Sequence, residues 1–65
     1  MKTRKWYSTS IRPDRAHGLI VMTDMGYVFE AEFYGDRFFT SVVRNGRVYF
    51  EEAIEQESIT KWMKV

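Results

Sequence analysis

Residues 27–50 read YVFEAEFYGDRFFTSVVRNGRVYF, and this stretch decides the fold. Over its first eight residues the apolar side chains alternate, which is typical of a half-buried strand rather than of a helix. We expect the more apolar of the two strand faces to point toward the core. This inner face carries Tyr27, Phe29, Ala31 and Phe33, and the outer face carries Val28, Glu30, Glu32 and Tyr34.

Two turns within the stretch predict how its strands pair. Gly35-Asp36 forms a two-residue loop with glycine in its first position, which favours a type II′ hairpin. Asn45-Gly46 is typical of a type I′ turn, because both residues tolerate a positive φ. The predicted pairs are Tyr34 with Arg37, Phe33 with Phe38, Ala31 with Thr40, Phe29 with Val42, Val42 with Tyr49, Val43 with Val48, Ser41 with Phe50, and Arg44 with Arg47.

Residues 18–23 read as a further strand that is apolar on both faces. Its buried face depends on the loop that follows. A two-residue loop, Met25-Gly26, would bury Ile20 and Met22, whereas a three-residue loop would bury Leu19 and Val21. Both alternatives remain open at this point.

The two ends of the chain complete the pattern. Trp6 and Tyr7 predict a short first strand, followed by a polar loop over residues 8–17 with a turn at residues 12–14. Residues 51–58 are compatible with two helical turns or with a loop. Residues 59–63 alternate again and predict a closing strand.

A chain of 65 residues is long enough for one domain, which we assign to residues 1–65. It has no cysteine, so packing has to stabilise it, and its 2 Trp, 4 Tyr and 5 Phe supply large apolar side chains. We predict a mainly β fold: a small antiparallel meander or partly closed barrel of five to six short strands, with one short helix near residues 51–58 as an option. The aromatic side chains expected on its inner face are Tyr27, Phe29, Phe33, Phe38 and Tyr49.

The residues give little support to catalysis, metals or cofactors. The lone histidine, His17, lies near Asp14 and the serines of residues 8–10, but this grouping is not a catalytic motif. One histidine without cysteine provides no recognisable metal site, and we expect no cofactor. The basic start of the chain is not followed by an apolar segment of the kind found in signal peptides, so we expect a cytoplasmic protein that does not enter membranes.

A set of aromatic and glycine positions resembles a family of small uncharacterised domains encoded mostly by bacteriophages and prophages. These positions are Trp6, Pro13, the strand from Leu19 to Met22, Gly26, the segment Ala31-Glu32-Phe33-Tyr34-Gly35, Phe38, and the closing Ile59-Thr60-Lys61-Trp62-Met63. The chain departs from the family in having Lys61 where members tend to carry His, and in lacking their Leu-Pro tail. The resemblance implies a compact β-rich fold and a mobile-element origin, with no known reaction or ligand.

The outer face of the predicted sheet is unusually apolar for so small a chain. Its candidate contact residues are Val28, Tyr34, Phe39, Val43, Val48 and Phe50, with the three valines in one row across three strands. The face is covered by the terminal segments, by closure of the sheet, by a second copy or by another protein. We therefore predict a non-enzymatic module that binds a protein partner or itself and acts by steric occupation, for example as an inhibitor of a host factor.

An alternative function is binding of nucleic acid or a small nucleotide. The net charge of +1 gives no global attraction for polyanions, but basic and aromatic residues are interleaved at several places. The candidates are Arg4, Lys5, Trp6, Arg12, Arg15, Arg37, Lys61 and Trp62.

Overall fold

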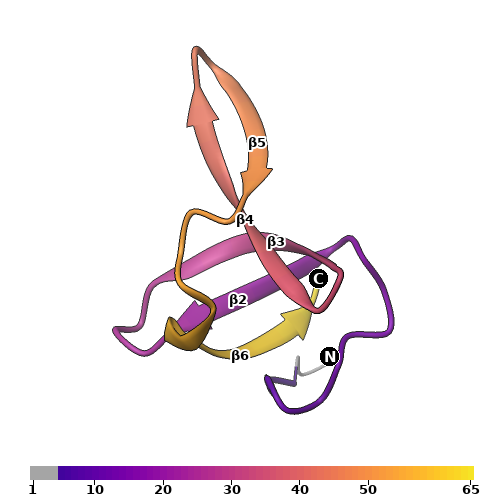
Figure 1. Ribbon diagram of the computed structural model, residues 1–65. Coiled ribbons are helices and arrows are strands. Elements are labelled where there is room, and N and C mark those ends of the chain that lie inside the picture. The colour runs from indigo at the N-terminus through magenta and orange to yellow at the C-terminus, as the bar shows by residue number, and fades with distance from the viewer. Residues whose placement is uncertain (1–4) are drawn as a thin grey trace, which may run out of the picture.

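The structure is a computed structural model that describes residues 5–65, and these form one open antiparallel sheet (Figure 1). The strands are β1 (Tyr7–Ser8), β2 (Leu19–Thr23), β3 (Val28–Tyr34), β4 (Arg37–Arg44), β5 (Arg47–Glu51) and β6 (Ile59–Lys64). Their order across the sheet is β1-β6-β2-β3-β4-β5. The predicted mainly β fold of five to six short strands is confirmed, and the sheet does not close into a barrel.

The loop between β2 and β3 has three residues, which settles the buried face of β2. The Thr23 N–H donates to the Tyr27 carbonyl at 2.8 Å, and Leu19 pairs with Ala31. Leu19, Val21 and Thr23 are accordingly buried, whereas Ile20 and Met22 are half-buried on the other face. Tyr27 directly follows this loop and is 60% exposed, so its predicted place in the core is wrong.

The hairpin of β3 and β4 has the predicted register but a different turn. Tyr34 pairs with Arg37, Phe33 with Phe38, and Ala31 with Thr40. Gly35 and Asp36 both have positive φ, +54° and +66°, which is the type I′ geometry rather than the predicted type II′. Aspartate tolerates the left-handed region better than most residues, so Asp36 can occupy the second position.

The pairing of β3 with β4 ends at Ala31 and Thr40, and the predicted pair of Phe29 with Val42 does not form. Beyond Thr40, β4 pairs with β5 alone, through Val42 with Tyr49, Val43 with Val48, and Arg44 with Arg47. Asn45 and Gly46 have φ of +51° and +75°, as the predicted type I′ turn requires. In Figure 1 the end of this hairpin projects away from the other strands.

Residues 51–58 do not form two helical turns. β5 continues to Glu51, and the only helical element in residues 5–65 is the 3-10 turn η1 (Gln56–Ser58). The closing strand β6 then runs between β1 and β2. Its register against β2 shifts at one point, because Met22 pairs with Lys61 whereas Thr23 pairs with Ile59.

The register shift in β6 brings Ile59 and Trp62 to the same buried side of the sheet. Without the extra residue, Thr60, these two positions would point to opposite faces. The shift thus adds a second large side chain to the core, whose buried apolar members are Leu19, Val21, Ala31, Phe38, Ile59 and Trp62.

Trp62 joins the sheet to the loop between β1 and β2. Its indole is 2% exposed and stacks on the Tyr7 ring at a centroid distance of 4.7 Å. Its Nε1 donates a hydrogen bond of 2.8 Å to the Ile11 carbonyl. The residue therefore holds this loop over the core face of the sheet. Within residues 5–65 no helix has the length and apolar character needed to cross a membrane.

We predict that Trp62→Phe lowers the free energy of unfolding by about 1–3 kcal/mol, because the Ile11 carbonyl loses its donor and the core loses packed atoms. Urea unfolding followed by far-UV circular dichroism measures the loss. Trp6→Phe is the matched control, since Trp6 is half-buried and precedes β1, and it should change stability by less than about 0.5 kcal/mol. Equal stability of the two variants would contradict this role of Trp62.

Candidate functional site

The end of the β4–β5 hairpin forms a distinct feature, which we call the hairpin arm (residues 41–50). β4 is eight residues long, but only Arg37 to Thr40 pair with β3. From Ser41 onward the only strand of the described residues 5–65 that pairs with β4 is β5. The hairpin arm therefore leaves the body of the sheet, as Figure 1 shows.

Both faces of the hairpin arm carry exposed apolar side chains. Val43 and Val48 form a cross-strand pair on one face and are 70% and 57% exposed. Tyr49 lies opposite Val42 on the other face and is 43% exposed. The face with Tyr49 also carries Arg44 and Arg47, and the face with Val43 also carries Ser41. Exposed apolar and charged side chains side by side on a projecting hairpin make it a candidate contact surface.

Tyr49 was expected in the core, and this prediction is wrong for a physical reason. Alternation along β5 does place Tyr49 on the same side of the strand as the core residues. The core itself ends where β4 leaves β3, so at Tyr49 that side of the hairpin faces solvent.

The structure divides the predicted outer-face set. Val43, Val48 and the half-buried Phe50 lie on the hairpin arm. Tyr34 and the half-buried Phe39 pack against each other on the sheet body, with ring centroids 6.0 Å apart. Val28 is exposed on β3, but β3 and β4 are unpaired at this level, so the predicted row of three valines does not form.

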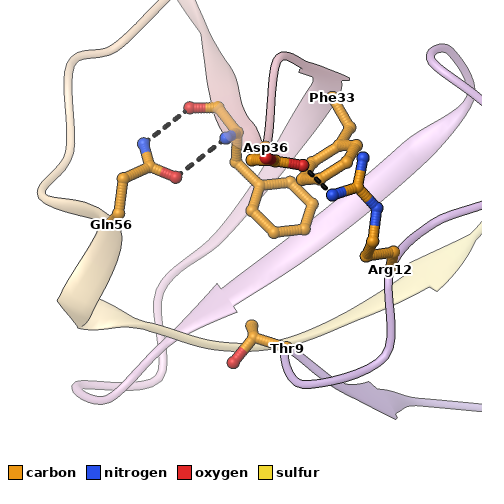
Figure 2. A pocket seen from close by; sticks show the side chains of 6 residues that line it. Thr9, Arg12, Phe33, Asp36 and Gln56 are labelled. Atoms are coloured by element: carbon orange, nitrogen blue, oxygen red, sulfur yellow. Dashed lines mark hydrogen bonds and ion pairs between the residues drawn. The ribbon is translucent and has the colours of Figure 1, made fainter.

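Gln56 marks the place where the sheet body meets the hairpin arm. Its side-chain Nε2 donates to the Phe38 carbonyl at 2.9 Å, and the Phe38 N–H donates to its Oε1 at 2.8 Å (Figure 2). Thr40, two residues further along β4, pairs with Glu51, the last residue of β5. The side-chain amide of Gln56 thus occupies the place that the second residue beyond Glu51 would take if β5 were longer. Nothing in the sequence pattern predicted this role, since a lone glutamine in a polar loop carries no periodic signal.

A cavity of about 250 Å³ lies beside this contact (Figure 2). Phe33 and Phe38 are its apolar walls, and Gln56 and Thr9 also line it. At its rim the Arg12 guanidinium pairs with Asp36 and lies 5.6 Å from the centre of the Phe33 ring. Its charged groups pair with each other rather than pointing at an open position, so the cavity is a weak candidate for a ligand site.

A second cavity, also of about 250 Å³, lies below the loop between β2 and β3. It is mainly apolar, with Phe29, Tyr27, Met25 and Ile54 among its lining residues. Two of its lining residues, Met25 and Tyr27, are themselves exposed, so the cavity lies outside the core.

His17 belongs to a small polar cluster and not to the grouping with Asp14 and serines that its sequence neighbours suggest. Its Nδ1 lies 3.0 Å from Glu32 Oε2, and the Tyr34 hydroxyl lies 3.2 Å from its Nε2. Partial removal from water, together with the nearby Glu32 carboxylate, raises the pKa of Tyr34. Within residues 5–65 no serine, threonine or cysteine side chain hydrogen-bonds to His17, whose partners are Glu32 and Tyr34, and no group of three potential metal ligands occurs there.

The predicted nucleic-acid residues do not form one surface. Trp62 is buried and cannot stack on a base, while Arg12 and Arg37 are paired with Asp36 and Glu52. Lys5 lies over the ring of Tyr7. Lys61 lies over the half-buried Trp6, and Arg15 is exposed beside Gly18. Arg4 lies outside the described residues.

Charged residues also flank the apolar side chains of the hairpin arm. Arg44 pairs with Glu51 diagonally across the hairpin, and its hydrogen bond lowers the pKa of that carboxyl group. Arg47 lies directly opposite Arg44. Within residues 5–65, Arg47 takes part in none of the ion pairs, so its charge is available to a partner.

We predict that Arg44→Gln raises the pKa of Glu51 toward its ordinary value, because the carboxylate loses its charged donor. A lowered carboxyl pKa stabilises the fold above the ordinary pKa, and this stabilisation disappears as the pH falls through the lowered value. NMR titration of the side-chain carboxyl carbon measures the shift. Arg37→Gln, which removes the partner of Glu52, should leave the Glu51 titration unchanged.

Among residues 5–65, the hairpin arm is the surface that most resembles a contact site, because it has exposed apolar side chains and its Arg47 forms no ion pair within those residues. No protein-family model, curated protein or solved structure matches the chain.

Proposed function

We propose that this chain is a non-enzymatic protein-binding module whose contact surface is the hairpin arm. The observation that carries the proposal is the exposure of apolar side chains on both faces of residues 41–50, which only β4 and β5 themselves support. Burying one valine or a larger apolar side chain in a partner contributes about 1.5–3 kcal/mol. Val43, Val48 and Tyr49 would each contribute part of this amount, according to how much of each side chain is exposed, toward the free-energy cost of association.

The action of such a module is steric. The sheet body holds the hairpin arm away from the rest of the chain, so a partner can approach the hairpin from either face. Tyr49 and the arginines at the hairpin end are residue types that carry much of the affinity in protein interfaces. The resemblance to phage-encoded domains makes a bacterial host protein the first class of partner to test, with occupation of its surface as the inhibitory step.

Nucleic-acid binding receives less support from the same geometry. It would require aromatic side chains that stack on bases beside free basic groups. Trp62 is in the core, and Arg12 and Arg37 already have carboxylate partners. The observed arrangement therefore favours a protein partner.

The test is affinity capture from a bacterial lysate to which an untagged copy of this chain has been added, with three tagged baits: the natural chain, the double variant Val43→Glu/Val48→Glu, and Val28→Glu. The double variant places charges where the apolar contact is proposed, so it should lose at least about 90% of a specific partner, as expected for a loss of more than tenfold in affinity. Val28→Glu is the matched control, because Val28 is an exposed valine outside the hairpin arm.

Support requires a defined protein that the natural chain and Val28→Glu retain, that the double variant loses, and that binds the purified natural chain in calorimetry. If neither a lysate protein nor the untagged copy follows this pattern, the hairpin arm is not a binding surface. Circular dichroism spectra of all three baits establish that the substitutions leave the fold intact.

A further inference from the structure

The structure assigns a particular partner to one edge of the hairpin arm: we propose that β5 pairs antiparallel with β5 of a second copy of this chain, centred on Tyr49. The inference rests on the proposed function, since it names the partner of the hairpin arm. Three observations support this pairing: β5 has a free edge, certain of its residues direct their backbone hydrogen-bonding groups to that edge, and the two ends of the strand carry opposite charges.

Among the strands of residues 5–65, β5 is the last one of the sheet, so one of its edges has no neighbouring strand there. In a hairpin with a two-residue turn, the residues that flank the turn exchange backbone hydrogen bonds, and the bonded pairs then alternate. Arg44 and Arg47 flank the turn, so Arg47, Tyr49 and Glu51 direct their backbone groups toward β4. Val48 and Phe50 consequently direct theirs toward the free edge.

Two identical antiparallel strands related by a two-fold axis can pair only in certain registers. Residues whose backbone N–H and C=O groups point to the free edge must lie opposite residues of the same kind in the second copy. This condition holds only when the two-fold axis passes through a residue and not between two residues. An axis at Tyr49 places Val48 opposite Phe50 of the second copy, and both residues offer free backbone groups. Since Tyr49 is the midpoint of β5, this register also uses the whole strand.

The same register is complementary in charge. It places Arg47 opposite Glu51 of the second copy, and the symmetry repeats this pair at the other end of the strand. Within residues 5–65, Arg47 has no ion-pair partner, and it lies across from the like-charged Arg44. Glu51 already accepts a hydrogen bond from Arg44 of its own chain at Oε2, which lowers the pKa of Glu51, so the second copy's Arg47 would bind the other carboxylate oxygen. An axis between two residues would pair backbone groups that point to the free edge with groups that point toward β4. An axis at Val48 or Phe50 keeps the hydrogen-bonding pattern but no longer places Arg47 opposite Glu51.

The apolar side chains of the hairpin arm continue across this junction. On one face Val43 and Val48 would be followed by Phe50 of the second copy, and on the other face Val42 and Tyr49 would be followed by the second Tyr49. The apolar side chains on each face of the hairpin arm, which contact solvent in the single chain, thus contact apolar side chains of the second copy in the dimer. The opposite edge of the sheet, formed by β1, offers fewer backbone groups for pairing with a second copy, because β1 has only two residues.

Cysteine cross-linking tests the position of the axis, because the natural chain contains no cysteine. In the proposed register the two copies of residue 49 form a non-hydrogen-bonded pair with Cα atoms about 4.5 Å apart, within reach of a disulfide. The two copies of residue 48 would be about 8 Å apart, beyond that reach. Tyr49→Cys should therefore form a disulfide dimer under mild oxidation at least about tenfold faster than Val48→Cys. Equal rates, or no dimer from either variant, would overturn the register.

Charge exchange tests the pairing of Arg47 with Glu51 without any covalent bond. Arg47→Glu and Glu51→Arg should each weaken self-association by about tenfold, because each sets two like-charged pairs opposite one another. A mixture of the two variants restores opposite charges at both ends, so sedimentation equilibrium should show a heterodimer as strong as the natural dimer. If the mixture associates no better than either variant alone, the pairing is wrong. The natural chain remaining monomeric at the concentrations used for NMR would also overturn it.

These results separate the inference from the function on which it rests. If the hairpin arm captures a lysate protein but Tyr49→Cys does not cross-link, the binding function stands and the second copy is not the partner. If neither capture of a partner nor cross-linking occurs, the binding function and the pairing of β5 with a second copy both fail.

Val48→Pro gives an independent check, because it removes an N–H directed at the free edge and leaves the pairing with β4 intact. This variant should lose self-association by at least tenfold with an unchanged circular dichroism spectrum, and retention of the dimer would contradict β5 pairing.

Discussion

The buried indole of Trp62 is the contact on which the rest of the fold depends. A chain of this size has room for few large core residues, and Trp62 reaches three parts of the chain at once: its own strand, the Tyr7 ring in β1 and the Ile11 carbonyl in the following loop. Strand β6 lies between β1 and β2, so the C-terminal strand has to be in place before the N-terminal one can pair. The fold is thereby closed by contacts between residues far apart in the sequence.

The position of Trp62 depends in turn on an irregularity in β6. Thr60 is the extra residue at the register shift, and its hydroxyl donates to the Met22 carbonyl at 3.2 Å. This bond anchors the shifted segment to β2. A regular strand would have turned either Ile59 or Trp62 away from the core, and a chain without disulfides could not spare either one.

Alternation and turn chemistry predicted the middle of the chain well, because there each depends only on neighbouring residues. The pairs made by Phe33, Ala31 and Val43 follow from the turns at residues 35–36 and 45–46. The shift at Thr60 and the contact of Gln56 with Phe38 could not be predicted, because they are set by partners distant in the sequence. The buried face of β2 stayed open because it depends on the length of the loop at residues 24–26, which the residue types there do not fix. The candidate site was predicted in part: Val43, Val48 and Phe50 are on the hairpin arm, whereas the exposure of Tyr49 depends on where β4 leaves β3.

The amide of Gln56 separates the sheet body from the hairpin arm, and this has a consequence for how the chain can diverge. None of the six buried core residues lies within residues 41–50, and Gln56 supplies the hydrogen-bond partner of Phe38 beyond the end of β5. Residues can accordingly be added to or removed from the hairpin in facing pairs, two on each strand, without disturbing the core or reversing the faces. The sheet body can therefore stay constant while the hairpin arm varies, both during evolution and when other loops are grafted onto it in the laboratory.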